Sequence, residues 1–448
     1  MHAILNRGDN MHFMMCSLPQ DIQREEGLGN FRKALKLIER WLKDERISSI
    51  QKERLLYEKE RINRLLETYP FSEKQAIVKA KEIIQDFSTE EFHSLLEEGY
   101  IDYIVVEGEK KFEKRFIPNI GFALNEYRER IKKDPDSEKA RSSLNDRLVE
   151  LTSGAKPKKY RVHARIEAKI EDGAGFFRVW LPFPKEEFQI SDVKFLRASQ
   201  KDCFISPNSS EQRIVYFEGK EKEYFVEFEY TVREWVHNSG YNIDSNLDQY
   251  LCEEPPHIVF TPYIRKLTDT VTGEEKDPYL RARKIYDWIT KHVRYSYVRP
   301  YATYENIAQY VAENLKGDCG FQAILFITMC RIAGIAARWQ SGWYANPYFA
   351  SPHDWALFYV QPYGWLPADL SFGGARRDNE QFRQFYFGNL DGFRMVANSG
   401  FARDFVPKTN FYRDDPTDNQ VGEAEAEDRK VRLKSKIQIV KFEEIQEG

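Results

Sequence analysis

Residues 317–338 read GDCGFQAILFITMCRIAGIAAR and place one cysteine at the start of an apolar helical pattern. The Gly-Asp pair before Cys319 predicts a turn, the apolar run after it predicts a buried helix, and Gly334 predicts the end of that helix. The unpaired N–H groups and the dipole at a helix N-terminus favour a thiolate over a thiol. We therefore predict that Cys319 is a nucleophile with a lowered pKa, whereas Cys330 belongs to the core.

A cysteine nucleophile needs a base, and the base needs a group that fixes its tautomer. His353 stands at the start of a predicted strand, and Asp369 ends the next strand. Regular hairpin pairing places Asp369 opposite Ala356 or Leu357, about 10 Å from His353 at roughly 3.4 Å per residue. Contact would therefore need a bulge or an irregular strand start. Asp354 should point to the opposite strand face, away from His353. These residues alone leave open a structural cysteine and a hydrogen-bonded histidine.

Three segments, in this order, resemble the transglutaminase-like superfamily. Residues 317–338 resemble its nucleophile segment, His353-Asp354-Trp355 resembles its H-x-W strand, and residues 364–369, GWLPAD, resemble its G-W-x-x-x-D strand. The resemblance covers residues 285–375. It implies Cys319 as the nucleophile, His353 as general base and acid, and Asp369 as the orienting carboxylate. The upstream Leu-Pro-Phe-Pro segment resembles the β-sandwich that precedes this domain in bacterial members.

The resemblance implies acyl transfer on peptide or protein amides through a thioester, with hydrolysis by a protease or amidase as the expected outcome. Two alternatives remain open: protein-glutamine transamidation, which cross-links proteins, and a non-catalytic binding or scaffold protein. Deglycosylation of glycopeptides by a related triad has less support, because no sugar-binding signature is visible. No calcium-binding loop is recognised, so the resemblance implies neither a metal nor another cofactor.

Two further groups of candidates surround the predicted triad. The Cys319 backbone N–H is the expected first donor to an oxyanion. Candidates for the second donor are Trp288, Tyr295 and Gln322. Candidates for lining a substrate cleft are Trp343, Tyr344 and Trp355.

Composition excludes several other classes of protein. The 448 residues include 67 Lys and Arg against 71 Asp and Glu, a formal net charge of −4, so a dedicated nucleic-acid binder is not expected. No stretch approaches the roughly 20 apolar residues that cross a bilayer. The five cysteines are scattered, and neither C-x-x-C, H-x-x-x-H nor a glycine-rich nucleotide motif occurs.

The changing periodicity predicts an α+β protein with an N-terminal helical region and a β-sandwich middle domain. The resemblance implies that a papain-like or transglutaminase-like α+β core follows. The predicted boundaries are 1–19 for a tail, 20–156 for the helical domain, 157–240 for the β-sandwich, and 241–448 for the catalytic domain with a C-terminal extension. The N-terminal helices are candidates for binding a protein partner. Because the N-terminus lacks an export-signal pattern, a cytoplasmic location is expected, with export as the alternative if the start is truncated.

Overall fold

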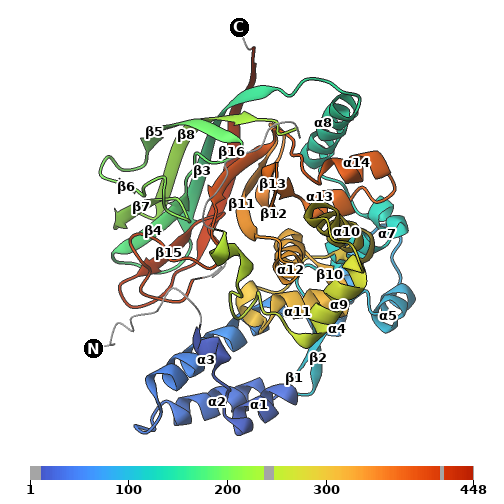
Figure 1. Ribbon diagram of the computed structural model, residues 1–448. Helices are drawn as coiled ribbons and strands as arrows, with labels where there is room; N and C mark the ends of the chain where they lie inside the picture. Colours follow the sequence, from blue (N-terminus) through green and yellow to red (C-terminus); the bar gives the residue numbers. More distant parts are fainter. Residues whose placement is uncertain (1–11, 237–246, 414–417, 447–448) are drawn as a thin grey trace.

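The computed structural model describes residues 12–236, 247–413 and 418–446 and confirms the predicted α+β class (Figure 1). The helices within residues 20–68 lie at the lower end of Figure 1, two facing sheets lie on the left, and a third sheet is covered by helices on the right. The predicted tail lies largely outside the described residues. The predicted boundary at residue 240 lies entirely outside them.

The N-terminal region is helical, as predicted. It comprises η1 (His12–Met15), α1 (Gln20–Gly27), α2 (Phe31–Trp41), α3 (Ser49–Thr68), α4 (Glu73–Ile83), α5 (Thr89–Glu97), β1 (Tyr103–Val106), β2 (Glu109–Phe112), α6 (Phe116–Ala123), α7 (Asn125–Arg130) and α8 (Pro135–Thr152). The apolar stripe of α2 packs on α3, with Ile38 and Ile62 completely buried. A capping box opens α5: Ser88 accepts a bond from the Glu91 backbone N–H, and the Glu91 side chain accepts one from Ser88 N–H.

The polar composition of residues 131–158 is typical of a linker, but α8 occupies most of this segment. Asp134 caps the helix by accepting a hydrogen bond from Ser137 N–H at 2.9 Å, and a proline occupies the first helical position. Apolar side chains spaced by three or four residues are buried on one face, among them Leu144, Leu148 and Leu151. This stripe stabilises a long helix that the overall polarity of the segment conceals.

Two four-stranded antiparallel sheets face each other. Their strands are β3 (Lys159–Ile170), β4 (Phe177–Pro182), β5 (Ile190–Ala198), β6 (Phe204–Ile205), β7 (Ile214–Gly219), β8 (Glu223–Arg233), β15 (Glu423–Ala426) and β16 (Leu433–Ile445). The strand orders are β16-β3-β8-β5 and β15-β4-β7-β6. Phe183 meets Phe228 across the interface, with ring centroids 5.3 Å apart. Strands from the end of the chain therefore complete both sheets.

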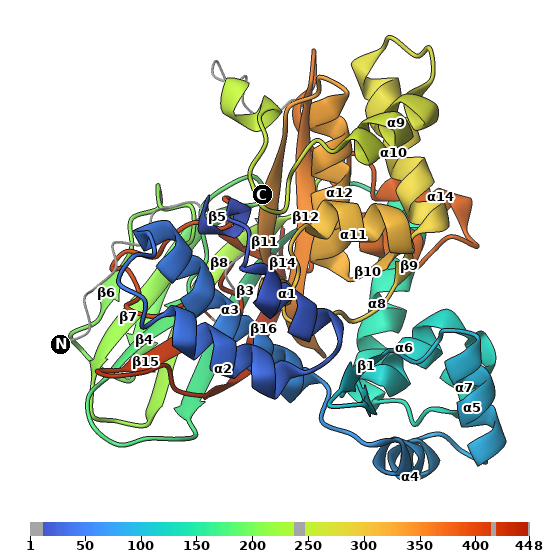
Figure 2. The ribbon, with the colours of Figure 1, turned by 90° about the horizontal axis from the view of Figure 1, so that it is seen from below.

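The third sheet has the order β13-β12-β11-β14. Its strands are β11 (Ala337–Ala345), β12 (Ala350–Val360), β13 (Gly364–Ala368) and β14 (Arg394–Asn398). The surrounding elements are η2 (Asp248–Leu251), α9 (Pro262–Thr272), α10 (Pro278–His292), β9 (Arg294–Tyr295), η3 (Tyr301–Thr303), α11 (Ile307–Asn314), β10 (Lys316–Gly317), α12 (Cys319–Ile332), α13 (Leu370–Gly374) and α14 (Glu380–Phe385). Figure 2 shows α9 to α12 on one side of β11 and β12 and the facing sheets on the other. Burial on both faces explains the apolar character of α12 and β12.

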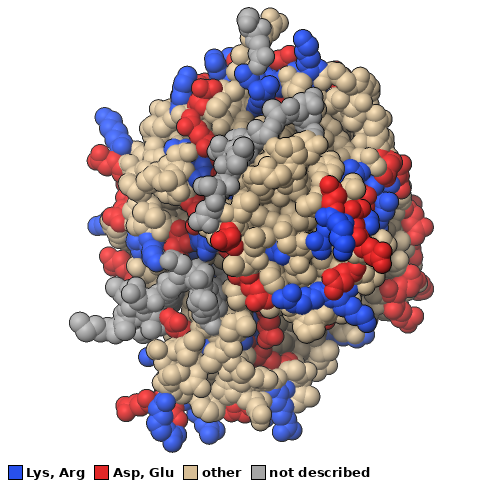
Figure 3. All heavy atoms as spheres, viewed as in Figure 1, with Lys and Arg blue, Asp and Glu red and all other residues tan. Residues whose placement is uncertain are grey.

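On the face shown in Figure 3, acidic and basic side chains are interspersed over the surface. This distribution agrees with the nearly balanced charge of the sequence. Among the described helices, none combines the length and the apolar character needed to cross a membrane.

Candidate active site

Cys319 is the first residue of α12, as the sequence predicts. Asp318 precedes it as the N-cap, and its Oδ1 accepts a hydrogen bond from Phe321 N–H at 3.1 Å. Gly317 belongs to β10, which pairs in parallel with β9 opposite Tyr295. The cysteine is therefore fixed where a short strand ends and a buried helix begins.

His353 and Asp369 are in contact, with 2.7 Å between Nε2 and Oδ2. The expectation that a regular hairpin would keep them apart was wrong. Ala356 pairs with Ala368, so Asp369 lies one residue past the last pair and on the same strand face as His353. The remaining offset of two residues, about 7 Å, is within reach of the two side chains. Asp369 also caps α13, because its Oδ1 accepts a bond from Phe372 N–H at 3.0 Å.

Arg394 completes this cluster, and the sequence analysis missed it. Its Nη1 lies 2.8 Å from Asp369 Oδ2, and its Nη2 lies 2.8 Å from Asp391 Oδ2. All three side chains are completely buried. The guanidinium also lies 4.4 Å from the centre of the Phe372 ring. Arg394 comes from β14, which pairs with β11 rather than with the predicted hairpin, so no local spacing could have identified it.

The electrostatics of the cluster fix the proton positions on the histidine. Burial alone would raise the pKa of Asp369, but its interactions with His353 and the charge of Arg394 outweigh burial and hold that pKa below its usual range. Burial lowers the pKa of His353, so the imidazole is neutral at neutral pH. Because Nε2 faces an ionised carboxylate, we assign the ring proton to Nε2 and the basic lone pair to Nδ1.

Cys319 contacts a different carboxyl. Its Sγ donates to Oδ2 of Asp354 at 3.2 Å. Asp354 does point away from His353, as predicted, but that face of β12 is the one packed against α12. Both Cys319 and His353 are described, and no hydrogen bond joins them. The structure thus brings together His353 and Asp369 of the predicted triad, whereas the Cys319 sulfur is hydrogen-bonded to Asp354.

The predicted lowering of the Cys319 pKa is not found. Burial, followed by the negative charges of Asp354 and Asp318, raises the pKa of the thiol well above its usual range. The helix N-terminus therefore does not outweigh two adjacent carboxyls, and the thiol is protonated at neutral pH in this arrangement.

Comparisons with known proteins give one family match within the chain. Residues 265–370 match the family model described as the transglutaminase-like superfamily. This segment is a transglutaminase-like domain. It contains Cys319, His353 and Asp369, and the match places it in a family of cysteine-based acyl transfer.

Solved structures match the chain at low identity and with TM-scores below 0.5. One, described as "a Putative Cysteine Protease from Cytophaga hutchinsonii", has 16% identity and a TM-score of 0.44, and the match covers 66% of this chain and 93% of that one. The periplasmic domain of TgpA from Pseudomonas aeruginosa has 15% identity and a TM-score of 0.29, covering 52% of this chain and 94% of that one. No curated protein sequence matches the chain.

The three residues predicted to line a cleft lie on β11 and β12 and belong to the core. Trp343 and Trp355 are completely buried, and Tyr344 is nearly so. Their polar atoms are satisfied internally, since Trp343 Nε1 donates to Gln420 O at 2.6 Å and Trp355 Nε1 donates to Gln340 Oε1 at 2.7 Å. Because both faces of this sheet are covered, its aromatic side chains pack instead of meeting a substrate.

The three candidates for an oxyanion donor differ in their surroundings. The Gln322 amide is buried and donates to Gly317 O at 3.0 Å, so this donor is already engaged. The Trp288 ring stacks on His292 with centroids 5.2 Å apart. Tyr295 lies beside the nucleophile: burial raises its pKa, and so does the charge on Cys319. Tyr295 therefore remains a predicted donor, as does Trp288.

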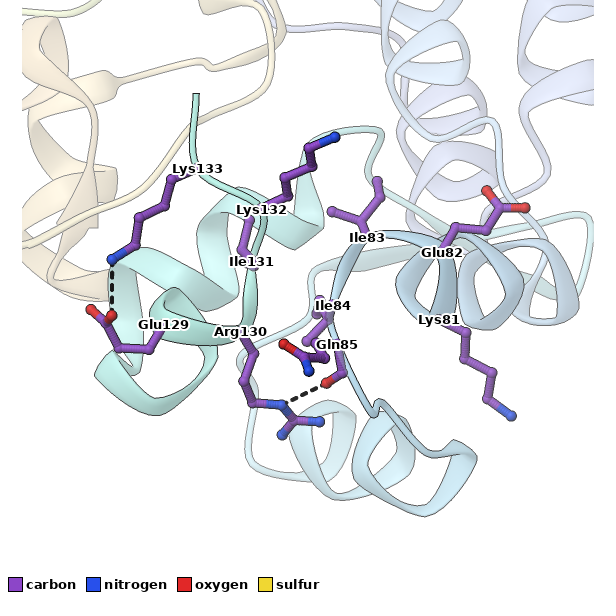
Figure 4. A pocket seen from close by; sticks show the side chains of 10 residues that line it. All are labelled: Lys81, Glu82, Ile83, Ile84, Gln85, Glu129, Arg130, Ile131, Lys132 and Lys133. Carbon is purple, nitrogen blue, oxygen red and sulfur yellow. Dashed lines mark hydrogen bonds and ion pairs between the residues drawn. The ribbon is translucent and has the colours of Figure 1, made fainter. Parts of the chain in front are cut away.

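A hollow of about 600 Å³ lies in the helical region and not beside Cys319 (Figure 4). It is lined by Lys81, Glu82, Ile83, Ile84, Gln85, Glu129, Arg130, Ile131, Lys132 and Lys133. Several of its cations are already paired: Lys133 binds Glu129 at 2.8 Å and Arg130 donates to Gln85 O at 2.8 Å. Among the described residues, no group of three His, Cys, Asp or Glu side chains is placed to hold a metal ion.

Proposed function

We propose that the transglutaminase-like domain hydrolyses peptide or protein amides, with Cys319 as the nucleophile, His353 as general base and acid, and Asp369 as the orienting carboxylate. The observation that supports this proposal most directly is the buried His353–Asp369 hydrogen bond of 2.7 Å within the segment that matches the family. A carboxylate at Nε2 leaves Nδ1 of His353 as the atom that receives the thiol proton.

The proposed reaction has two steps. The Cys319 proton passes to His353 Nδ1, the sulfur attacks the amide carbonyl, and the C–N bond breaks as His353 returns the proton to the leaving amine. Water, deprotonated by His353, then attacks the thioester, and the C–S bond breaks to release the carboxylic acid and the thiol. The Cys319 backbone N–H, among the first of α12, has no intrahelical partner and is the group that we assign to bind the oxyanion.

This reaction requires a movement of the sulfur. In the structure, Cys319 Sγ is bonded to Asp354, so the thiol must leave that carboxyl before it meets Nδ1 of His353. Because Asp354 and His353 point to opposite faces of β12, this movement carries the sulfur away from the face that Asp354 occupies. Substrate binding is the event that we expect to bring about this change.

The proposal is tested by incubating the protein with a defined pool of C-terminally amidated peptides and methylamine, with products followed by mass spectrometry. We expect peptides shortened or deamidated by hydrolysis and a peptidyl adduct on Cys319, both lost in Cys319→Ala. Incorporation of methylamine into glutamine side chains without hydrolysis would instead identify a transamidase. If folded protein yields neither product, the scaffold alternative replaces the proposed activity.

A further inference from the structure

We infer that Asp354 is a further catalytic residue, which keeps the Cys319 sulfur protonated and bonded to its own carboxyl until substrate displaces it. The inference adds a latent state to the proposed function and rests on Cys319 being the nucleophile. Its starting point is the hydrogen bond of 3.2 Å from Cys319 Sγ to Asp354 Oδ2, in place of a bond to His353.

Close packing holds the Asp354 carboxyl against the first turn of α12. A Cβ atom added at Gly320 would lie 2.8 Å from Asp354 Oδ2 and 2.2 Å from the Tyr301 hydroxyl oxygen. Only glycine leaves room for these two groups at the residue after the nucleophile. The Tyr301 hydroxyl in turn donates to Asp318 Oδ1 at 2.7 Å, which fixes that carboxyl beside the helix start.

The second oxygen of Asp354 is held by Gln420, which lies outside the segment that matches the family. Gln420 Nε2 donates to Asp354 Oδ1 at 2.5 Å and to His353 O at 3.0 Å. The Gln420 backbone is itself fixed, because its carbonyl accepts the Trp343 indole N–H. Gln420, which lies between β14 and β15, thus sets the orientation of the Asp354 carboxyl and also binds the backbone carbonyl of His353.

The groups around the sulfur explain why the thiol keeps its proton. Asp354 faces it from β12, Asp318 from its own helix start, and the phenols of Tyr295 and Tyr297 from β9 and the residues after it. None of these four side chains can carry a positive charge. The Asp354 backbone N–H favours the thiolate but does not reverse the effect of the carboxyls.

Cys319 and Asp354 therefore titrate as a pair. Two negative charges 3.2 Å apart in a buried site repel strongly, so the pair holds at most one charge at neutral pH. Asp418 also faces Asp354 and, with burial as the largest cause, raises the pKa of that carboxyl. In the hydrogen bond between them the sulfur is the donor and the carboxyl oxygen the acceptor. Because the ordinary pKa of a carboxyl lies several units below that of a thiol and both are raised here, we expect the carboxyl to ionise first. Removing the carboxyl charge should consequently allow the sulfur to ionise at lower pH.

The experiment measures carbamidomethylation of Cys319 by iodoacetamide between pH 6 and 10, with the modified residue assigned by mass spectrometry. The sulfur attacks the methylene carbon, iodide leaves, and the thiol proton passes to solvent. We expect Asp354→Asn to label at least about tenfold faster than wild type at pH 7, with the pH midpoint moved downward. Asparagine removes the charge and offers an N–H to the thiolate. Gln420→Ala, which releases the carboxyl, should give a smaller increase.

Asp269→Asn is the matched control, because this exposed carboxyl of α9 makes no side-chain contact with the site, and its labelling rate should equal that of wild type. Circular dichroism and thermal unfolding establish that each variant is folded. If folded Asp354→Asn labels at the wild-type rate or more slowly, the inference is wrong. Should that variant fail to fold, an unchanged rate in Gln420→Ala overturns it equally.

The labelling needs no substrate, so its outcome is separate from that of the peptide assay. Faster labelling in Asp354→Asn together with no peptide hydrolysis supports the inference about the thiol and contradicts the proposed activity. Peptide hydrolysis together with unchanged labelling supports the activity and overturns the role of Asp354.

Discussion

Replacement of Asp369 by asparagine, or of His353 by alanine, is expected to lower the rate of Cys319 acylation by about 10³–10⁴-fold. The Asp369 carboxylate accepts the Nε2–H of His353 and so keeps the basic lone pair on Nδ1. An asparagine can present its amide N–H to Nε2 instead, which reverses the tautomer and places the proton on Nδ1. The histidine could then no longer accept the thiol proton, although the packing of the site would be unchanged.

The rate is measured with p-nitrophenyl acetate, an activated ester whose acyl transfer to a thiol releases coloured p-nitrophenolate. Cys319→Ala gives the background, and Asp269→Asn provides an exposed Asp-to-Asn control that should react like wild type. An acylation rate in folded Asp369→Asn within threefold of wild type would show that Asp369 does not orient the base.

The pH dependence of the same reaction has a defined sign. His353 must be neutral to accept a proton, and burial lowers its pKa. The acid limb of the wild-type profile should therefore lie below the ordinary histidine value of about 6.5, with activity lost as pH falls through it. The His353→Ala variant should lack this limb. An acid limb above pH 6.5 in wild type would contradict the neutral imidazole.

The sequence was sufficient for the parts of the site that depend on local pattern. An apolar run bounded by Gly-Asp and Gly334 predicts a buried helix beginning at Cys319, and the structure begins α12 there. Two apolar runs separated by a turn likewise predict the strand that carries His353 and the strand that ends at Asp369. Their contact was implied by the resemblance but not by the spacing, because the hairpin estimate used backbone positions alone, whereas two side chains on one face close a two-residue offset.

The charged surroundings of the site could not be predicted, because they come from distant parts of the chain. Arg394 reaches Asp369 through the pairing of β14 with β11, and Gln420 reaches Asp354 from beyond that strand. The sign of the Cys319 pKa shift depends on these placements and not on the helix start alone. Similarly, whether Trp343 lines a cleft or a core depends on what covers the sheet, which strand periodicity does not reveal.

Substitution of Arg394 by methionine is expected to lower the free energy of unfolding by about 3–5 kcal/mol. Arg394 neutralises Asp369 and Asp391 in a site from which water is excluded, with all three side chains completely buried. Methionine conserves much of the volume but leaves two carboxylates without their cation. The loss should therefore come from uncompensated buried charge, and urea unfolding followed by tryptophan fluorescence measures it.

Arg383→Met is the matched control. Arg383 is also completely buried, but its carboxylate partners, Asp287 and Glu380, keep 31% and 56% of their side-chain surface exposed. Water can solvate those partners once the arginine is removed, so this variant should lose less stability than Arg394→Met. Equal losses in the two variants would show that removal of a buried guanidinium, and not the stranding of buried carboxylates, determines the effect.

Lowering the pH should reduce the difference in free energy of unfolding between Arg394→Met and the wild-type protein. In the wild-type protein, the depressed pKa of Asp369 contributes stability that is present above its unfolded pKa of about 3.9 and is lost as pH falls towards the folded value. In Arg394→Met, burial without the cation should raise the pKa of Asp369, so protonation of this carboxyl below neutral pH removes its uncompensated charge. The stability deficit should consequently shrink between pH 7 and pH 4, whereas a deficit caused by lost packing would be independent of pH.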